Sequence, residues 1–205
     1  MKKYILLVCT TIFLLTMGSC SKDFLDKDPL DRLTGDQYWK SKADFDMALT
    51  AIYGQLQNSI FSYGSPNWDV LTDNGYGQHN YNGSQGIVRG EIFPSSGGYI
   101  VDIYNACYSG IARANIFLSK LATYEGTELD AAARARYEGE ARFVRGFYYY
   151  MLYACYGAVP LVTEPLALEN QAQAKASEAE VLAQTLADLD AAIANLGATL
   201  YANGD

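Results

Sequence analysis

Histidine and cysteine are scarce in this sequence. Its 205 residues include one histidine, His79, and four cysteines, none of them in a C-x-x-C pair. Structural zinc sites draw roughly four ligands from closely spaced Cys and His residues, so this composition excludes them. The chain also lacks a G-x-S-x-G turn, a Walker loop and an H-E-x-x-H motif. These absences argue against the common hydrolases and nucleotide-binding enzymes, and we expect neither a cofactor nor a metal.

Basic residues are also few. Lysine and arginine total 15 against 23 Asp and Glu, which gives a formal net charge of −8 at pH 7. Proteins that bind nucleic acid present a basic patch or stripe to the phosphate backbone, and segments that grip anionic lipid are polybasic. The charge balance therefore excludes a nucleic-acid partner and an electrostatic attachment to lipid headgroups.

What the sequence does contain begins with an apolar N-terminal stretch. Lys2 and Lys3 supply positive charge, residues 4–17 are uncharged and mostly apolar, and small residues precede Cys20. This is the order of features in a secretory signal peptide. The apolar run is shorter than the roughly 20 residues that a membrane-spanning helix needs.

The end of this stretch, LLTMGSC, resembles a bacterial lipobox, in which small residues precede a cysteine that is lipidated and becomes the new N-terminus. We therefore predict a lipoprotein signal peptide at 1–19, a lipidated tether at 20–40 and a folded domain at 41–205. Stable membrane attachment requires more than one acyl chain, and several chains on Cys20 would provide it. A transmembrane anchor and a secreted protein without lipid are the alternatives.

Four amphipathic helices are predicted in the folded domain, because apolar residues recur at steps of three and four. Three of them begin with a Ser or Thr followed three residues later by an acid, which is a helix-start signature: Ser41 with Asp44, Thr127 with Asp130, and Ser177 with Glu180. The third helix must end before Gly157 and Pro160. The expected buried stripes are Phe45, Leu49, Ile52 and Leu56; Ile103, Cys107, Ile111, Ala114, Leu118 and Leu121; Tyr137, Ala141, Val144, Tyr148, Met151 and Cys155; and Leu182, Leu186, Leu189, Ile193 and Leu196.

These helices predict a mainly α fold, since no run of residues alternates convincingly as strands do. Consecutive helices joined in pairs are typical of a helical bundle or an α-solenoid. The 34-residue tetratricopeptide pattern is matched only weakly, so any such repeats are degenerate.

One long segment, residues 59–99, interrupts the helical pattern. It is rich in Gly, Asn, Ser and Tyr, and structureless connections beyond about 12–15 residues are usually functional or disordered. Its aromatic content is not that of disorder, so we predict a folded binding loop. Flat aromatic faces beside amide and carboxylate groups suit a neutral, polyhydroxylated ligand, although a peptide or a protein interface needs similar groups. The ligand-binding candidates are Trp68, Asp73, Asn74, Tyr76, His79, Tyr81 and Arg89, with Asp69, Asn80 and Tyr99 also available.

Several segments together resemble the SusD/RagB family of outer-membrane lipoproteins. They are CSKDFLDKDPLDRLT, YWKSKADFDMALTAIY, SGIARANIFL and, most specific, GEARFVRGFYYYMLYACYGAVPLV. The resemblance implies a SusD-like helical scaffold with degenerate tetratricopeptide-like helix pairs. It also implies a non-catalytic surface protein that binds oligosaccharide, or peptide as RagB-like members do, and delivers it to a TonB-dependent, SusC-like transporter. Family members are generally more than twice as long, so 41–205 is expected to be an incomplete N-terminal domain.

Other readings remain open for particular residues. Arg142 and Arg145 could recognise an anion, but we favour a structural ion-pair network, because they lie among core aromatics. Asp69 and Asp73 could form the carboxylate pair of a glycoside hydrolase, whose two groups lie about 5–10 Å apart, but nothing in the sequence distinguishes one acid from the other. A scaffold that contacts only proteins is the remaining alternative.

Cys107 and Cys155 both fall on expected apolar helix faces. Free Cys is among the most buried residue types, so we favour two buried thiols over a disulfide. Tyr148, which shares the stripe of Cys155, is likewise expected in the core and not in a sugar-binding platform.

Overall fold

The computed structural model describes residues 38–61 and 68–198. The predicted signal peptide, Cys20 and the tether up to residue 37 lie outside the described residues. The chain divides into two compact units, Met1–Tyr38 and Trp39–Asp205, and the description below concerns the second.

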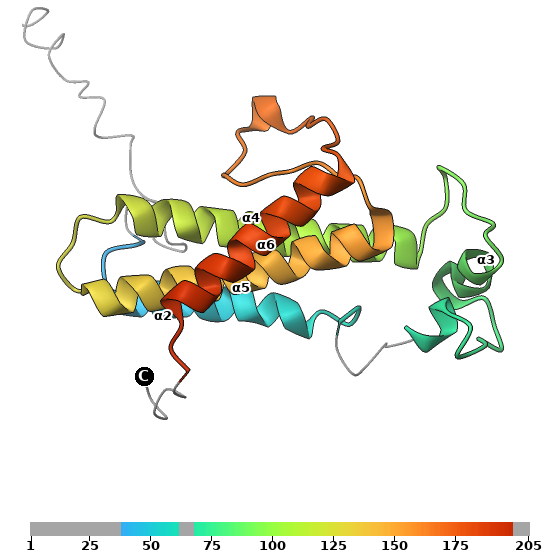
Figure 1. The fold of residues 1–205 in the computed structure, drawn as a ribbon, viewed down its shortest axis with the longest axis horizontal. Coiled ribbons are helices and arrows are strands. Elements are labelled where there is room, and N and C mark those ends of the chain that lie inside the picture. Colours follow the sequence, from blue (N-terminus) through green and yellow to red (C-terminus); the bar gives the residue numbers. More distant parts are fainter. Residues whose placement is uncertain (1–37, 62–67, 199–205) are drawn as a thin grey trace, which may run out of the picture. The chain divides into compact units, whose positions relative to one another are not determined.

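The second unit is built from helices. The α-helices are α2 (Lys42–Gly54), α3 (Ser84–Val88), α4 (Tyr99–Thr123), α5 (Ala131–Tyr156) and α6 (Glu178–Asn195), and the short 3-10 helices are η2 (Gln55–Gln57), η3 (Asp69–Leu71), η4 (Tyr81–Gly83) and η5 (Leu168–Asn170). Figure 1 shows α4 and α5 side by side in opposite directions, with α2 along α5 and α6 crossing it. Within residues 38–61 and 68–198 there is no β-strand, only an isolated bridge between Pro160 and Lys175. The prediction of a mainly α fold is confirmed.

Two of the predicted helix starts are confirmed at α2 and α6. At α2, the Ser41 hydroxyl accepts a hydrogen bond from the Asp44 amide at 3.2 Å, and the Asp44 carboxylate accepts one from the Ser41 amide at 2.8 Å. Ser177 and Glu180 form the same reciprocal pair at α6. Each pair satisfies two amides that the first turn of a helix leaves without partners.

The predicted start of the third helix was wrong. Asp130 and not Thr127 caps α5, with its carboxylate accepting from the Ala133 amide at 2.7 Å. The turn before it is fixed by tertiary contacts, because Leu129 is buried and Arg134 donates to the Tyr124 carbonyl at 2.8 Å.

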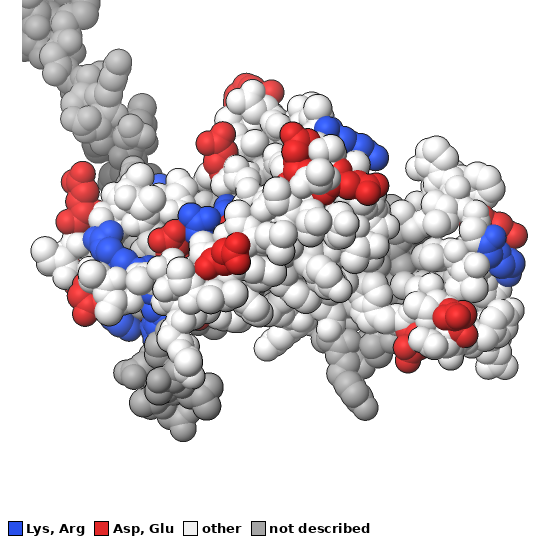
Figure 2. Space-filling model, in the orientation of Figure 1, with Lys and Arg blue, Asp and Glu red and all other residues white. Residues whose placement is uncertain are grey.

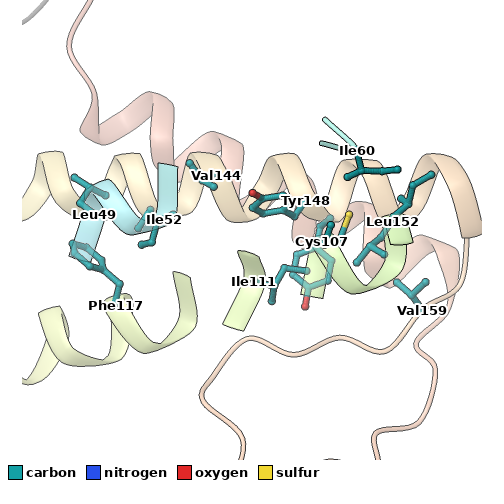
Figure 3. Packing of buried hydrophobic residues seen from close by; sticks show 14 of the residues in the cluster. Leu49, Ile52, Ile60, Cys107, Ile111, Phe117, Val144, Tyr148, Leu152 and Val159 are labelled. Carbon is teal, nitrogen blue, oxygen red and sulfur yellow. The ribbon is translucent and has the colours of Figure 1, made fainter. Parts of the chain in front are cut away.

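The core lies between α2, α4 and α5, where the three predicted stripes meet (Figure 3). The buried members of those stripes are Phe45, Leu49 and Ile52 from α2; Ile103, Cys107, Ile111, Ala114 and Leu121 from α4; and Tyr137, Ala141, Val144 and Tyr148 from α5. Burial of apolar surface at about 25 cal/mol per Å² is the main stabilising term for such a core. Tyr148 is fully buried, as predicted.

The predicted buried face of α6 was wrong. The residues that α6 buries are Val181, Thr185, Asp188 and Ala192, whereas Leu182, Leu186 and Ile193 are exposed. The physical reason is an ion pair. Asp188 is drawn into the interface by arginines of α5, and this rotates the leucine stripe away from it.

Arg145 of α5 makes the central polar contacts between α5 and α6. Its guanidinium donates to both carboxylate oxygens of Asp188, at 2.7 and 2.6 Å, and to the side-chain oxygen of Asn115 at 2.8 Å and the carbonyl of Thr163 at 3.1 Å. Arg142 adds a hydrogen bond to Asp188 at 3.2 Å. The planar fork of arginine suits such bidentate contacts. The structural interpretation of the two arginines is confirmed.

The two remaining cysteines are free thiols. Cys107 is fully buried, as predicted, and burial raises its pKa to about 12, with a further contribution from nearby Cys155. Cys155 is exposed, so the expectation that both thiols are buried was wrong for this residue. It lies in the last turn of α5 and lines a cavity with Tyr156. Within the part of the chain that the structure describes, no helix is long and apolar enough to cross a membrane.

Candidate ligand-binding site

The candidate site is built from residues 68–98, the described part of the predicted binding loop. This segment follows α2 and precedes α4 in the chain, and it is folded, as predicted. It is not structureless, because it contains η3, η4 and α3, with η3 packed against α3 (Figure 1). A continuous loop was expected here because elements of three to five residues are too short to show a periodic pattern.

Hydrogen bonds and close backbone contacts hold this segment together. The Gln85 side chain donates to the Gly77 carbonyl at 2.8 Å, and the Gln85 amide donates to the side chain of Asn80 at 3.0 Å. Gly98 has a φ of 65°, and a Cβ there would lie 2.2 Å from the Asn82 carbonyl oxygen. Only glycine fits such a position, so Gly98 allows the end of the segment to return against its middle before α4 begins.

A polar cavity of about 500 Å³ opens within the segment. Its polar side chains come from Asn80, Asn82, Arg89, Glu91 and Ser96, and several glycines also line it. Arg89 and Glu91 form an ion pair at 3.0 Å. Because these charges offset each other, the cavity offers donors and acceptors without a large net charge.

An apolar cavity of about 400 Å³ lies between the segment and the helices. Trp68, Asp69 and Leu71 line it from the segment, and Tyr99 and Tyr156 line it from α4 and α5. The Tyr156 hydroxyl donates to the Ile100 carbonyl, which ties the end of α5 to the start of α4.

The two cavities share lining residues, Ile87 and Ile100. They are therefore neighbours, one polar and one apolar. Their sizes fall within the roughly 300–1,000 Å³ that is usual for ligand pockets. A ligand with both hydroxyl groups and an apolar ring face has matching surfaces here.

Only some of the predicted ligand-binding residues line the two cavities. Asn80 and Arg89 line the polar cavity, and Trp68 and Asp69 line the apolar one. Trp68 is half-buried and packs against the hydrophobic core.

Tyr76 and Tyr81 belong to the same segment and are exposed over 75% and 67% of their surfaces, but neither lines one of the two cavities. His79 packs edge-on against Tyr81, with ring centroids 5.4 Å apart. Asp73 and Asn74 are exposed and line neither cavity. These five residues offer surface contacts only.

Tyr99, which the sequence grouped with aromatic rings available to a ligand, lines the apolar cavity from α4 but is only 3% exposed, because it begins α4 and packs into the core.

Three residues that line the cavities were not predicted from the sequence: Tyr156, Glu91 and Phe93. Tyr156 was assigned to a core helix, and only the tertiary fold brings it near Trp68. Glu91 was overlooked although it stands two residues from Arg89, a spacing that permits an ion pair. Phe93, which lines the polar cavity and is 65% exposed, was a visible aromatic signal in the same segment.

The comparisons with known proteins agree on one family. A SusD-like family model, described as starch-binding and associating with the outer membrane, matches residues 23–203. SusD-like protein P38 of Formosa agariphila is 28% identical over 207 residues, which cover 96% of this chain and 39% of the relative. SusD-like protein P25 of the same organism is 26% identical over 209 residues, with 95% and 38% covered. The chain thus spans about two fifths of the length of these relatives.

Solved structures share the fold. A laminarin-binding SusD-like protein superposes with a TM-score of 0.64 at 26% identity, covering 77% of this chain and 34% of that one. Surface glycan-binding protein A from Bacteroides uniformis superposes with a TM-score of 0.69 at 26% identity, covering 80% of this chain and 37% of that one. The family model matches most of the sequence, and these solved structures share the helical scaffold of the chain. The chain therefore belongs to the SusD-like family.

Proposed function

We propose that this chain forms part of a lipid-anchored surface protein that binds oligosaccharide and delivers it to a TonB-dependent outer-membrane transporter. Binding and not catalysis is its role in this proposal. The family description names starch binding and the outer membrane, and two structural neighbours are named for binding laminarin or surface glycans.

One observation carries the glycan proposal: a neutral polar cavity adjoins an apolar, aromatic one in the segment 68–98. A sugar ring has an apolar face of C–H groups and an equator of hydroxyls. Trp68 and Tyr156 offer aromatic surface for the ring face. The amides of Asn80 and Asn82 and the Arg89–Glu91 pair offer hydrogen-bond donors and acceptors for the hydroxyls.

Titration calorimetry with the purified chain tests this proposal. The probes are maltooligosaccharides and laminarin oligosaccharides, with a tetrapeptide library as comparison. Saturable binding of a glycan is expected, and substitution of Trp68 should weaken it. Binding of peptides alone would favour a RagB-like peptide-binding protein. Absence of binding to any probe, together with co-purification of a transporter, would favour a scaffold that contacts only proteins.

The lipid anchor is a separate part of the proposal, because Cys20 lies outside the described residues. It rests on the lipobox-like sequence and on the outer-membrane association of the family. The intact mass of the native protein extracted from membranes tests it. We expect cleavage before Cys20 and the added mass of acyl chains, and Cys20→Ser should release the protein from the membrane. A membrane-extracted protein without acyl chains would contradict the anchor.

A further inference from the structure

A further cavity lies between α4 and the 157–176 loop, which connects α5 to α6. Figure 1 shows this loop in orange, extending from the end of α5 to the start of α6. The cavity has a volume of about 310 Å³, at the lower end of the roughly 300–1,000 Å³ that is usual for ligand pockets. It shares no lining residue with either cavity of the proposed ligand site. We call it the loop cavity.

The walls of the loop cavity are mainly apolar. Helix α4 contributes Tyr108, Ile111 and Ile116, and the loop contributes Val162, Pro165 and Leu166. Ile111 is buried, whereas Ile116 and Leu166 are exposed over 44% and 38% of their surfaces. The described chain therefore leaves apolar surface at this cavity in contact with solvent, and a ligand with an apolar body would cover it.

The loop side of the cavity is held in place by side chains of the helices. The Tyr108 hydroxyl donates to the Pro160 carbonyl at 2.6 Å, and the Asn115 side chain donates to the Val162 carbonyl at 2.7 Å. The Tyr149 hydroxyl accepts a hydrogen bond from the Val162 amide. Because this wall is already ordered, a ligand does not have to bear the entropic cost of ordering it.

Two polar side chains of the loop, Glu164 and Gln171, also line the cavity. Among the residues that the structure describes, neither side chain forms a hydrogen bond or an ion pair with the protein. The donors of Tyr108 and Val162 are already used within the protein. An ionised carboxylate can only accept hydrogen bonds, so Glu164 requires a donor or a cation from the ligand.

The surroundings of the loop cavity are acidic. No Lys or Arg is among the residues that line it. The loop contains Glu164 and Glu169, and the first turn of α6 adds Glu178 and Glu180, against Lys175. Figure 2 shows acidic side chains gathered over the loop and the start of α6. This charge favours a cationic ligand over an anionic one.

The nearest arginines do not neutralise Glu164. Glu164 also borders a polar cavity that Arg142 and Arg145 line. However, Arg142 is paired with Glu138 at 2.7 Å, and Arg145 is paired with Asp188 at 2.6 Å. The charge of Glu164 therefore remains available to a ligand.

We propose that the loop cavity binds a small primary ammonium compound with an apolar body, of the arylalkylamine class. The apolar body lies against Ile111, Ile116 and Leu166, and the ammonium group donates hydrogen bonds to Glu164. Because Glu164 is exposed, water and salt weaken its attraction. The apolar walls therefore supply most of the affinity, and Glu164 supplies the preference for positive charge.

NMR titration of the purified chain with three probes tests this proposal. Phenethylamine, 2-phenylethanol and phenylacetate carry the same ring with a positive, a neutral and a negative head. We expect phenethylamine to bind at least threefold more tightly than the alcohol and phenylacetate to bind most weakly, with amide shifts near Ile116 and Leu166. Equal affinities, no binding of any probe, or shifts confined to residues 68–98 would overturn the proposal.

Three variants locate the ligand. Glu164→Gln should weaken phenethylamine at least threefold and leave 2-phenylethanol unchanged. Glu169→Gln is the matched control, because Glu169 is exposed in the same loop but does not line the cavity, and it should change the affinity less than twofold. Ile116→Trp fills the cavity and should abolish binding of both probes. Equal losses in the two glutamate variants, or normal binding by Ile116→Trp, would contradict the site.

The outcome is separable from that of the glycan proposal. Glu164, Glu169 and Ile116 line neither cavity of the proposed ligand site, so these variants should bind glycan as the unsubstituted chain does. Trp68→Ala, in turn, should leave phenethylamine binding unchanged. A loss of phenethylamine binding in Trp68→Ala that matches its loss of glycan binding would place the amine in the glycan site and overturn the proposal.

Discussion

The ring of Tyr148 occupies the place where a side chain at position 110 would stand. A Cβ on Gly110 would lie 2.0 Å from Cε2 of Tyr148, far inside van der Waals contact. Tyr148 is fully buried in α5 and Gly110 is buried in α4. The absence of a side chain at position 110 therefore allows α4 and α5 to pack with the ring between them.

The first prediction follows from this contact. Gly110→Ala should lower the free energy of unfolding by about 3 kcal/mol, because the buried ring cannot move aside without straining the core. Urea unfolding followed by circular dichroism measures the loss. Gly54→Ala is the matched control: nothing lies within 4 Å of the new Cβ, and an alanine at this helical position should raise stability by about 0.5–1 kcal/mol. Similar effects at both positions would contradict the packing argument.

The second prediction compares two adjacent tyrosines. The Tyr149 hydroxyl donates to the Val162 carbonyl at 2.8 Å and accepts from the Val162 amide at 2.7 Å. The Tyr148 hydroxyl is buried and has no hydrogen-bond partner among the described residues. Tyr149→Phe should therefore destabilise the fold by about 1–3 kcal/mol, whereas Tyr148→Phe should be neutral or slightly stabilising. Thermal and urea unfolding of both variants check this, and a larger loss at 148 than at 149 would refute it.

The third prediction concerns the ion pair between α5 and α6. Asp188 is fully buried and Arg145 is 4% exposed. Asp188→Asn should cost about 3–5 kcal/mol of folding free energy, because it leaves a buried guanidinium without its counter-charge. Asp190→Asn, two residues further along and exposed, should change stability by less than about 0.5 kcal/mol. Urea unfolding of the two variants distinguishes a buried structural pair from a general effect of charge on α6.

A fourth prediction is a pH dependence at α2. Partial burial acts to raise the pKa of Asp46, but hydrogen bonds from Tyr137 and Lys42, with the charges of Lys42 and Arg136, outweigh it and hold that pKa below its ordinary value. The unfolded chain therefore binds this proton more readily than the folded chain. The stabilisation is complete above about pH 4 and is lost as the pH falls through the lower folded value.

Substitution at this carboxylate should show the effect. Asp46→Asn is expected to lower stability at pH 7 and to flatten the decline in unfolding free energy between about pH 5 and pH 2. Tyr137→Phe, which removes a hydrogen bond to Asp46, should act in the same direction to a smaller extent. Urea midpoints across that range provide the measurement. Identical pH profiles for Asp46→Asn and the unsubstituted chain would show that Asp46 is not a source of acid lability.

The sequence predicted what depends on neighbours in the chain. The capping pairs at Ser41 and Ser177 involve residues three apart, so their pattern is complete in the sequence. Most members of the predicted core stripes of α2, α4 and α5 are buried, because burial on one face imposes a regular spacing of apolar residues, but Leu56, Leu118 and Met151 are only partly buried and Cys155 is exposed. The family resemblance, read from four segments, was confirmed by the match over residues 23–203.

The features that the sequence could not give depend on distant residues. The face of α6 was misassigned because a leucine stripe is normally buried, and only contact with Arg145 of α5 reveals that Asp188 takes the buried position. The two candidate cavities lie at the segment that the sequence singled out, but some of their walls come from residues outside it. Tyr156 lines the apolar cavity from α5, 88 positions after Trp68 in the chain. Tyr99, the first residue of α4, is buried.

The last prediction tests the ligand site by comparing its aromatic residues. Trp68 lines the apolar cavity, whereas Tyr76 is exposed and lines neither cavity. Trp68→Ala should weaken glycan binding about tenfold or more, which corresponds to ~1.4 kcal/mol, because the wall against which a sugar ring would stack is removed. Tyr76→Ala should have a smaller effect.

Calorimetric titration of each variant measures these affinities, with Met47→Ala on α2 as a control that should bind as the unsubstituted chain does. Since Trp68 also packs against the core, the melting temperature of each variant must be compared with its affinity. A Trp68 variant that stays folded and binds normally would move the site to the exposed tyrosines, and a larger loss at Tyr76 would identify the outer surface as the place where the sugar stacks. If Trp68→Ala alone loses binding while remaining folded, the ligand is held in the apolar cavity that Trp68 lines.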